Sequence, residues 1–157
     1  MRITLLTVGK TEDAYIREGI EKYSKRLKHY TRLEIIDLPE LKNTKALTPE
    51  QQKAKEAEMI LKKLAPADHV VLLDERGTEL TSAGLAAYID KKAIASTVNI
   101  VFIIGGPYGF DQALYHRCND KLSLSRMTFS HQMVRLFFIE QLYRAYTIIK
   151  GEPYHHE

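Results

Sequence analysis

The stretch VNIVFIIGGPYGF, residues 98–110, decides the fold class. An apolar run, interrupted only by Asn99, opens this stretch. The run ends at the glycine pair Gly105 and Gly106. Such a run lacks the polar–apolar alternation of a half-exposed strand, so both faces of this strand are expected to be covered. The segment HVVLLD, residues 69–74, has the same character. Buried strands of this kind are typical of parallel sheets in α/β domains.

The rest of the chain alternates between strand-like and helix-like apolar spacing. Strands are predicted at 2–8, 33–38, 69–74, 98–104 and 121–125, and helices at 11–30, 48–64, 82–94, 110–118 and 130–150, with a polar loop at 41–48. This order predicts one α/β domain over residues 1–157, with a mostly parallel sheet of five or six strands and helices on both faces. Ligands in such sheets bind at the carboxyl ends of the strands. The loops after residue 9 and at 74–77, 105–110 and 125–130 are therefore the candidate binding loops.

Composition narrows the class of protein. Of the 157 residues, 45% are apolar and 27% charged, which is ordinary for a globular chain and excludes disordered and fibrous classes. The single cysteine, Cys118, excludes a disulfide scaffold and favours a reducing compartment. No stretch approaches the roughly 20 apolar residues of a membrane span, and no signal peptide is recognisable. A cytoplasmic protein that does not bind membranes is expected.

The glycine loop at 103–110 favours a ligand that approaches the backbone closely. The alternative is a plain strand-to-helix turn, which seldom needs three glycines. The loop lacks the Lys-Ser/Thr of a Walker A motif and the spacing of a dinucleotide fingerprint, which disfavours an ATP- or NAD-dependent enzyme. A cofactor with an adenosine but no phosphate suits such a loop. A larger side chain at Gly106 is expected to fill the binding pocket.

The second candidate segment is LSLSRMTFSHQMVR, residues 122–135, which mixes polar and apolar residues where an ordinary turn is short and polar. Ser130 is a suitable cap for the helix that follows. His131, at the start of that helix, is more often a structural or capping residue than a catalyst.

The last predicted helix is apolar nearly all round, with one narrow polar strip at Glu140, Arg144 and Thr147. In so small a domain such a helix needs a second cover, which favours a two-fold dimer. The alternative is a central core helix.

A basic run precedes the second strand and contains no acidic residue. Its side chains attract phosphate, although a solvated helix face is the alternative. The members are Lys22, Lys25, Arg26, Lys28, His29 and Arg32.

The tail GEPYHHE, residues 151–157, ends in residues that stack on bases and carry protons near neutral pH, namely Tyr154, His155 and His156. No other cluster of metal-ligand type accompanies the two histidines, so a metal site is not expected.

Together these motifs resemble a known family. The segments ITLLTVGK, LLDERG, IIGGPYG, LSLSRMTF-HQ and EQLYRAYTIIKGEPYH are similar to those of the RlmH family of ribosomal large-subunit RNA methyltransferases, in the SPOUT (α/β-knot) superfamily. The resemblance spans essentially the whole chain. It implies a knotted α/β homodimer that uses S-adenosylmethionine to methylate N3 of a pseudouridine in the 23S rRNA of assembled ribosomes.

The resemblance also implies roles for single residues. The cofactor site would comprise Leu73, Gly106, Ser125, Arg126, Met127, Thr128, Phe129 and Ser130. Tyr154 and His155, supplied by the partner subunit, are candidates for handling the proton that leaves N3. Lys22, Lys25, Arg26, Lys28 and Arg32 would bind rRNA phosphates without reading sequence.

Two positions depart from the family pattern. Ser130 stands where proline is usual, and His156 stands where arginine or lysine is common. The alternative hypothesis is that the protein is not an enzyme but a catalytically silent ribosome- or RNA-binding module with the same fold. Such a module would not bind the methyl donor.

Overall fold

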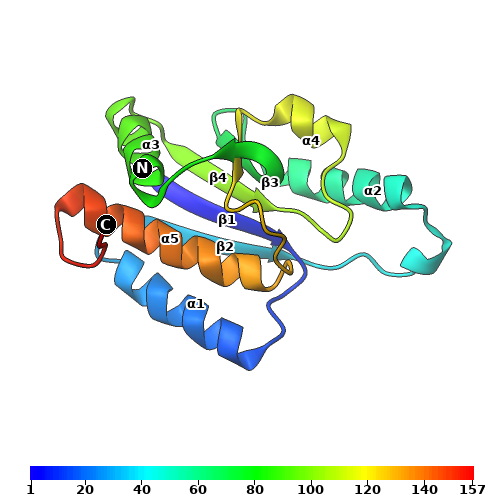
Figure 1. Cartoon of the computed structure of the whole chain (residues 1–157). Coiled ribbons are helices and arrows are strands. Elements are labelled where there is room, and N and C mark those ends of the chain that lie inside the picture. The colour runs from blue at the N-terminus through cyan, green and yellow to red at the C-terminus, as the bar shows by residue number, and fades with distance from the viewer.

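The structure, a computed structural model, describes residues 1–157 and consists of one parallel sheet between two layers of helices (Figure 1). The strands are β1 (Arg2–Val8), β2 (Arg32–Leu38), β3 (His69–Glu79), β4 (Asn99–Ile104) and β5 (Asp120–Ser123). The helices are α1 (Ala14–Leu27), α2 (Pro49–Lys62), α3 (Ser82–Ile94), α4 (Gln112–Arg117) and α5 (Met133–Lys150), with a short 3-10 helix at Thr44–Ala46.

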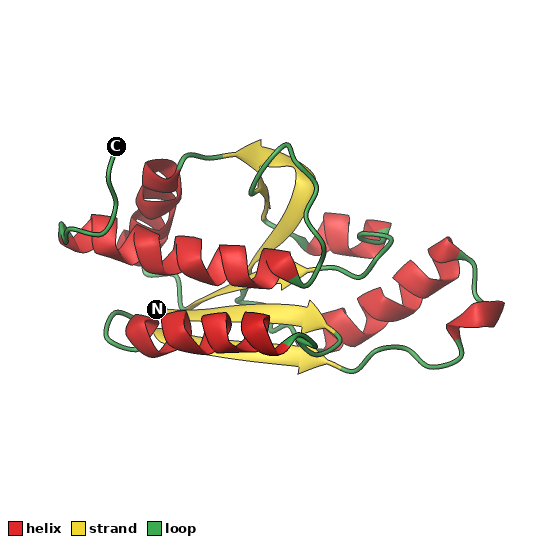
Figure 2. Ribbon diagram, turned by 60° about the horizontal axis from the view of Figure 1, so that its bottom comes forward, coloured by secondary structure: helices red, strands yellow, loops and turns green.

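The strand order is β2-β1-β4-β3-β5, and every neighbouring pair is parallel. Two buried clusters lie on opposite faces of the sheet. One contains Phe102 and Phe138 beneath α1, α3 and α5, and the other contains Ile60 and Leu114 beneath α2 and α4. Figure 2 shows the helices on both sides of the strands. The predicted α/β class, parallel sheet and two-sided covering are confirmed, with five strands.

Local signals explain most of the element ends. Thr48 caps α2: its hydroxyl accepts the Gln51 N–H at 3.1 Å, and Gln51 Oε1 accepts the Thr48 N–H at 2.9 Å. The last helix begins at Met133 and not at residue 130, although Ser130 Oγ does accept the Met133 N–H at 3.1 Å. The segment predicted as a loop at 41–48 contains the 3-10 helix.

β3 is longer than the predicted strand at 69–74. Its pairing with β5 shifts register between Leu73 and Thr78, so the chain bulges and then resumes beside Leu122 and Ser123. Gly77 sits in this bulge with no space for a side chain, because a Cβ there would lie 2.7 Å from Leu122 N. The bulge brings the polar end of β3 around the end of β5.

A buried arginine joins α5 to the end of β1. Arg135 is 1% exposed, and its guanidinium donates to Gly9 O at 2.8 Å, to Val8 O at 3.0 Å and to Thr11 Oγ1 at 3.2 Å. Its Nε also donates to His131 O at 3.2 Å. These bonds fix the segment before α5 against the carboxyl end of β1.

α5 is covered more fully by its own chain than the sequence suggests. It packs between α1 and α3, and Thr147, placed by the sequence in a polar strip, is fully buried. Thr147 Oγ1 is satisfied by the Arg144 carbonyl at 2.7 Å. A side of the helix that includes Phe137, which is 38% exposed, remains open in the single chain.

Candidate active site

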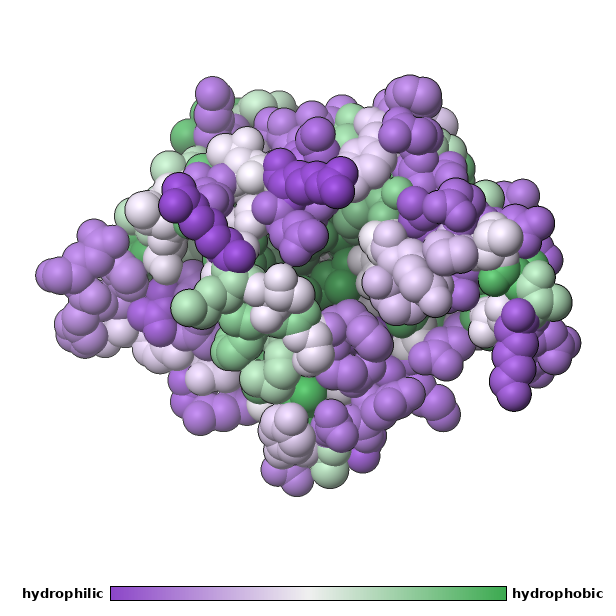
Figure 3. Space-filling view, turned by 45° about the vertical axis from the view of Figure 1, so that its right-hand side comes forward, coloured by the Kyte–Doolittle hydropathy of each residue, from purple (hydrophilic) through white to green (hydrophobic).

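A cavity of about 420 Å³ opens at the carboxyl ends of β4 and β5, beside the middle of β3 where its bulge begins. This volume is in the range of roughly 300–1,000 Å³ that small-molecule sites occupy. We call it the strand-end cavity. Its lining comes from residues 73–75 in the middle of β3, from residues 104–110 of the glycine loop and from the segment 123–134. Figure 3 views the molecule from the side toward which the strands point and shows an apolar hollow with a polar rim.

The strand-end cavity brings together all but one of the residues predicted to bind the cofactor. Leu73, Gly106, Ser125, Met127, Thr128, Phe129 and Ser130 line it. Arg126 does not: its side chain is 87% exposed and forms an ion pair with Glu79 at 3.0 Å. The sequence did not single out the other lining residues, among them Asp74, Glu75, Gly105, Ser123 and Val134. Their only signal was their place in or beside the strand-end loops.

The segment before α5 leaves backbone donors free. Among residues 124–131 only the Met127 N–H donates to an acceptor of the protein, the Ser125 hydroxyl at 2.9 Å. Unpaired amides next to a cavity are available to a ligand. No lysine or arginine lines the strand-end cavity, whereas Asp74 and Glu75 do. The cavity therefore offers free backbone donors, and the carboxylates at its rim favour a positively charged ligand.

The glycine loop has the backbone expected of a tight turn. Gly109 has a φ of 83°, and its N–H donates to Gly106 O at 3.2 Å. A Cβ at Gly105 would lie 3.1 Å from the Phe110 ring. The glycines therefore let the loop close on itself beside the cavity.

A larger residue at Gly106 was expected to fill the binding pocket. That expectation is wrong, because the new side chain would point toward α2. A Cβ at Gly106 would lie 2.6 Å from Glu56 Oε2 and 2.7 Å from Glu56 Oε1, on the side of α2. Glu56 is only 4% exposed. New bulk at this position presses on a buried carboxyl and on α2, and does not project into the strand-end cavity.

We therefore expect Gly106→Val to lower the free energy of unfolding by about 1–3 kcal/mol, as overpacking of a well-packed site does. Urea denaturation followed by far-UV circular dichroism measures this. Combining the change with Glu56→Ala should recover part of the loss, because the two side chains then no longer collide. A Gly106→Val protein as stable as the parent would contradict the packing described here.

Tyr154 and His155 lie along α5 in their own chain and not at the strand-end cavity. Tyr154 Oη donates to Glu140 Oε1 at 2.9 Å, and its ring is 4.7 Å from the Tyr143 ring centroid. Arg144 Nη1 lies 3.2 Å from His155 Nδ1. Burial and hydrogen bonds to Tyr23 and Glu140 raise the pKa of Tyr154, so its hydroxyl keeps its proton. Within one chain the structure does not bring the two candidate catalytic residues to the cavity.

The basic run lies on the outer surface of α1 and at the start of β2. Lys22, Lys25, Arg26, Lys28 and Arg32 are all exposed. Lys25 forms an ion pair with Glu21 at 3.1 Å, and Arg26 lies over the rings of Tyr23 and Tyr143. No group of three or more His, Cys, Asp or Glu side chains is arranged to hold a metal ion. No helix is both long and apolar enough to span a membrane.

Comparisons with known proteins agree with these features. The family described as "Predicted SPOUT methyltransferase" matches residues 1–155. A protein of Parabacteroides distasonis named "Ribosomal RNA large subunit methyltransferase H" is 52% identical over 157 residues, which is the full length of both chains. A protein of the same name from Cytophaga hutchinsonii is 54% identical over 99% of this chain and 100% of its own.

The fold is shared with a solved structure from Haemophilus influenzae described as a probable methylase family protein. That structure matches with a TM-score of 0.50 and 16% identity over 99% of this chain and 70% of its own. The resemblance noted from the sequence motifs is confirmed by the full-length relatives. The chain is an enzyme of the SPOUT methyltransferase family and groups there with proteins named ribosomal RNA large subunit methyltransferase H.

Proposed function

We propose that this protein transfers the methyl group of S-adenosylmethionine to N3 of a pseudouridine in the 23S rRNA of the assembled ribosome. The observation that carries the proposal is the strand-end cavity in a chain of this family: it has glycine-loop walls, free amides and no cation for a phosphate. The names of full-length relatives at about half identity point to rRNA as the substrate. The ribosome as substrate implies a cytoplasmic location.

The residues present suit the methyl donor. The glycine loop and the amides of residues 124–131 would hold the adenosine and methionine portions, while Asp74 and Glu75 favour a cationic ligand. When bound, the sulfonium supplies an already activated methyl group. The work left to the protein is to hold donor and acceptor in line, to exclude water and to receive the proton of N3.

The active form is proposed to be a homodimer in which Tyr154 and His155 of one chain approach the strand-end cavity of the other. Two features support this. Neither residue reaches the cavity of its own chain, and the open side of α5 carries Phe137, whose ring centroid is 4.8 Å from that of Phe129 at the cavity wall. An interface over Phe137 would place the partner beside the segment that lines the cavity.

The dimer makes a direct prediction. Phe137→Glu is expected to give monomers or aggregates, because the interface would have to bury an unpaired charge. Sedimentation equilibrium measures the mass, and Tyr108→Glu, a change at another exposed aromatic residue, serves as the control that should leave the dimer intact. A dimeric Phe137→Glu protein would show that this surface is not the interface.

The exposed cations of α1 and of the start of β2 are proposed to contact rRNA phosphates. They would add affinity and orientation without reading sequence. Recognition of the ribosome's shape would then supply part of the specificity, which is consistent with a net charge of only +3.

Two experiments test the function. Mass mapping of 23S rRNA from cells with and without the gene should show one methylated pseudouridine that depends on it. Calorimetry should show S-adenosylmethionine binding to the protein. A protein that binds ribosomes, does not bind S-adenosylmethionine and transfers no methyl group would instead be the silent binding module.

A further inference from the structure

One acidic side chain is buried next to the strand-end cavity without a cation. Glu56, on α2, is 4% exposed, and none of the ion pairs of the chain includes it. Its one hydrogen-bond partner is Gln52, whose Nε2 lies 3.4 Å from Glu56 Oε2. The neighbouring Ala57 and Ile60 are buried in the core. A carboxyl placed in this way is unfavourable for stability, so a role in function has to be considered.

The carboxyl of Glu56 faces a second cavity of about 180 Å³, which shares Gly106, Pro107 and His131 with the strand-end cavity. The two cavities therefore meet at the glycine loop and at the start of α5. The second cavity lies at the carboxyl ends of β1 and β2, where Val8 and Glu40 line it. It is smaller than the roughly 300 Å³ at which whole-ligand pockets begin, so it suits a single base rather than a second cofactor.

The polar groups of this second cavity match one kind of base edge. Gln52, Thr44 and His131 supply an amide, a hydroxyl and an imidazole that can donate, and Glu56 supplies a carboxylate that can accept. An imide edge of the uracil type presents the complementary groups, a central N–H between two carbonyl oxygens. A cytosine edge presents an acceptor where the imide has its N–H. That acceptor would face the Glu56 carboxylate, which also accepts hydrogen bonds, so the two groups would repel each other.

We propose that the second cavity binds the acceptor base of the reaction through its imide edge and that Glu56 takes the proton from N3. This deepens the proposed function and rests on it. The nitrogen forms a bond to the methyl carbon as the carbon–sulfur bond breaks, and that electron pair stays on sulfur. The N3 proton ends on the Glu56 carboxylate, so the charge of the sulfonium is balanced by the loss of the carboxylate charge.

Burial raises the pKa of Glu56, against a smaller lowering by the hydrogen bond from Gln52. A carboxylate with a raised pKa is a stronger base than an exposed one and is better matched to an imide proton. The other titratable groups that face it are Glu40, from the loop after β2, and His131, from the segment before α5. Both are exposed, so neither replaces a buried base.

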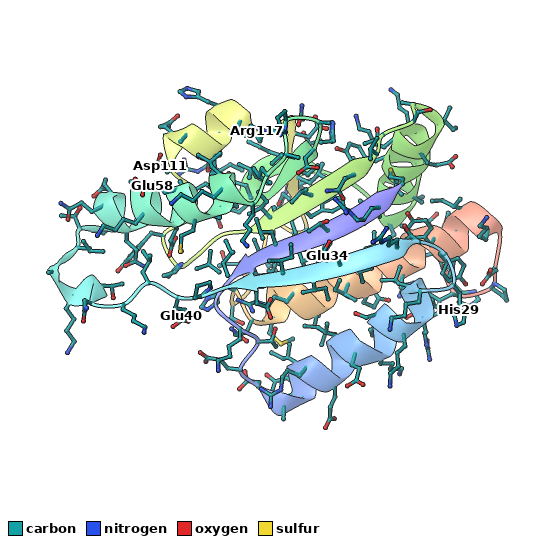
Figure 4. All side chains as sticks on the ribbon, turned by 180° about the vertical axis from the view of Figure 1, so that it is seen from behind. His29, Glu34, Glu40, Glu58, Asp111 and Arg117 are labelled. Atoms are coloured by element: carbon teal, nitrogen blue, oxygen red, sulfur yellow. The ribbon has the colours of Figure 1, made fainter.

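Glu56→Gln tests the catalytic part, because it keeps the size of the side chain and removes the base. With ribosomes as substrate and the donor saturating, single-turnover methyl transfer should fall by about 100-fold or more, while the calorimetric affinity for S-adenosylmethionine changes little. The matched control is Glu58→Gln, a change at an exposed residue of the same helix (Figure 4), which should leave both quantities unchanged. The parent rate should fall as the pH drops through the pKa of Glu56, and the residual rate of Glu56→Gln should lack that inflection.

A second readout needs no turnover. The ¹³C resonance of the Glu56 carboxyl should shift when pseudouridine nucleoside is added, and 3-methylpseudouridine, which lacks the N–H, should shift it much less. Equal shifts from the two nucleosides, or none from either, would overturn the base site. A parent protein that methylates ribosomes together with a fully active Glu56→Gln would overturn the role of Glu56. A parent that never methylates ribosomes would instead overturn the proposed function.

Discussion

Replacing Arg135 with methionine is expected to lower the free energy of unfolding by about 3 kcal/mol or more. The guanidinium donates to the buried carbonyl oxygens of Val8 and Gly9 and to the part-buried carbonyl oxygen of His131, where α5 meets β1. Each buried acceptor left without a donor costs about 1–3 kcal/mol. Methionine keeps most of the apolar stem, so the loss reports the hydrogen bonds more than the packing. Urea denaturation at a fixed protein concentration measures it.

Arg126→Met is the matched control, because the Arg126 side chain is 87% exposed and its ion pair with Glu79 lies on the surface. Surface pairs contribute about 0–1 kcal/mol, so this variant should stay close to the parent. The same Arg135→Met protein should also bind S-adenosylmethionine more weakly, since His131 borders the strand-end cavity. Equal stability of Arg135→Met and Arg126→Met would mean that the buried guanidinium does not hold the two segments together.

Removing Tyr154 to Glu157 is expected to lower methyl transfer by about 100-fold or more, because the tail of the partner would help to hold the acceptor base in line, and a misplacement of about 1 Å costs roughly that much. The affinity for S-adenosylmethionine should change little, because no tail residue lines the strand-end cavity. Single-turnover methylation of ribosomes gives the first quantity and calorimetry gives the second.

A shorter deletion, of His156 and Glu157 alone, separates the tail's chemistry from its packing. It leaves the Tyr154–Glu140 hydrogen bond and the contact of His155 with Arg144 in place. Most of the activity should survive this deletion. Full activity after removal of the whole of Tyr154–Glu157 would refute the role of the tail.

The sequence predicted β1, β2 and β4 to within one residue at each end, while β5 begins one residue and ends two residues before its predicted bounds. It missed the second part of β3, since residues 74–79 are mostly polar and read as a loop. Their strand character comes from the register shift against β5, which is a tertiary contact. Propensity and periodicity carry no information about such pairing.

Two buried charged residues were also not predicted from the sequence. Arg135 and Glu56 lie on helices, where arginine and glutamate are normally exposed, so neither attracted notice. A weak signal existed for Glu56, because it shares a helix face with Ile60 at a spacing of four residues. For Arg135 the decisive feature is the carbonyl oxygens that converge on it, and these come from segments about 120 residues away in the chain. The predicted loops at 105–110 and 125–130 do line the strand-end cavity, because parallel topology brings strand ends together, whereas the predicted loop at 74–77 belongs to β3.

The interior position of β1 in the sheet has a consequence for synthesis. Of the five strands β1 is synthesised first, and β2 follows it soon, but its other neighbour is β4, in which Asn99 pairs with Arg2. At about 5–20 residues per second, a nascent chain waits about 5–20 s before β4 arrives. During that interval one hydrogen-bonding edge of a strand that the finished sheet buries is unprotected, which invites pairing with other chains. The order of synthesis therefore leaves this chain open to aggregation for longer than its small size suggests.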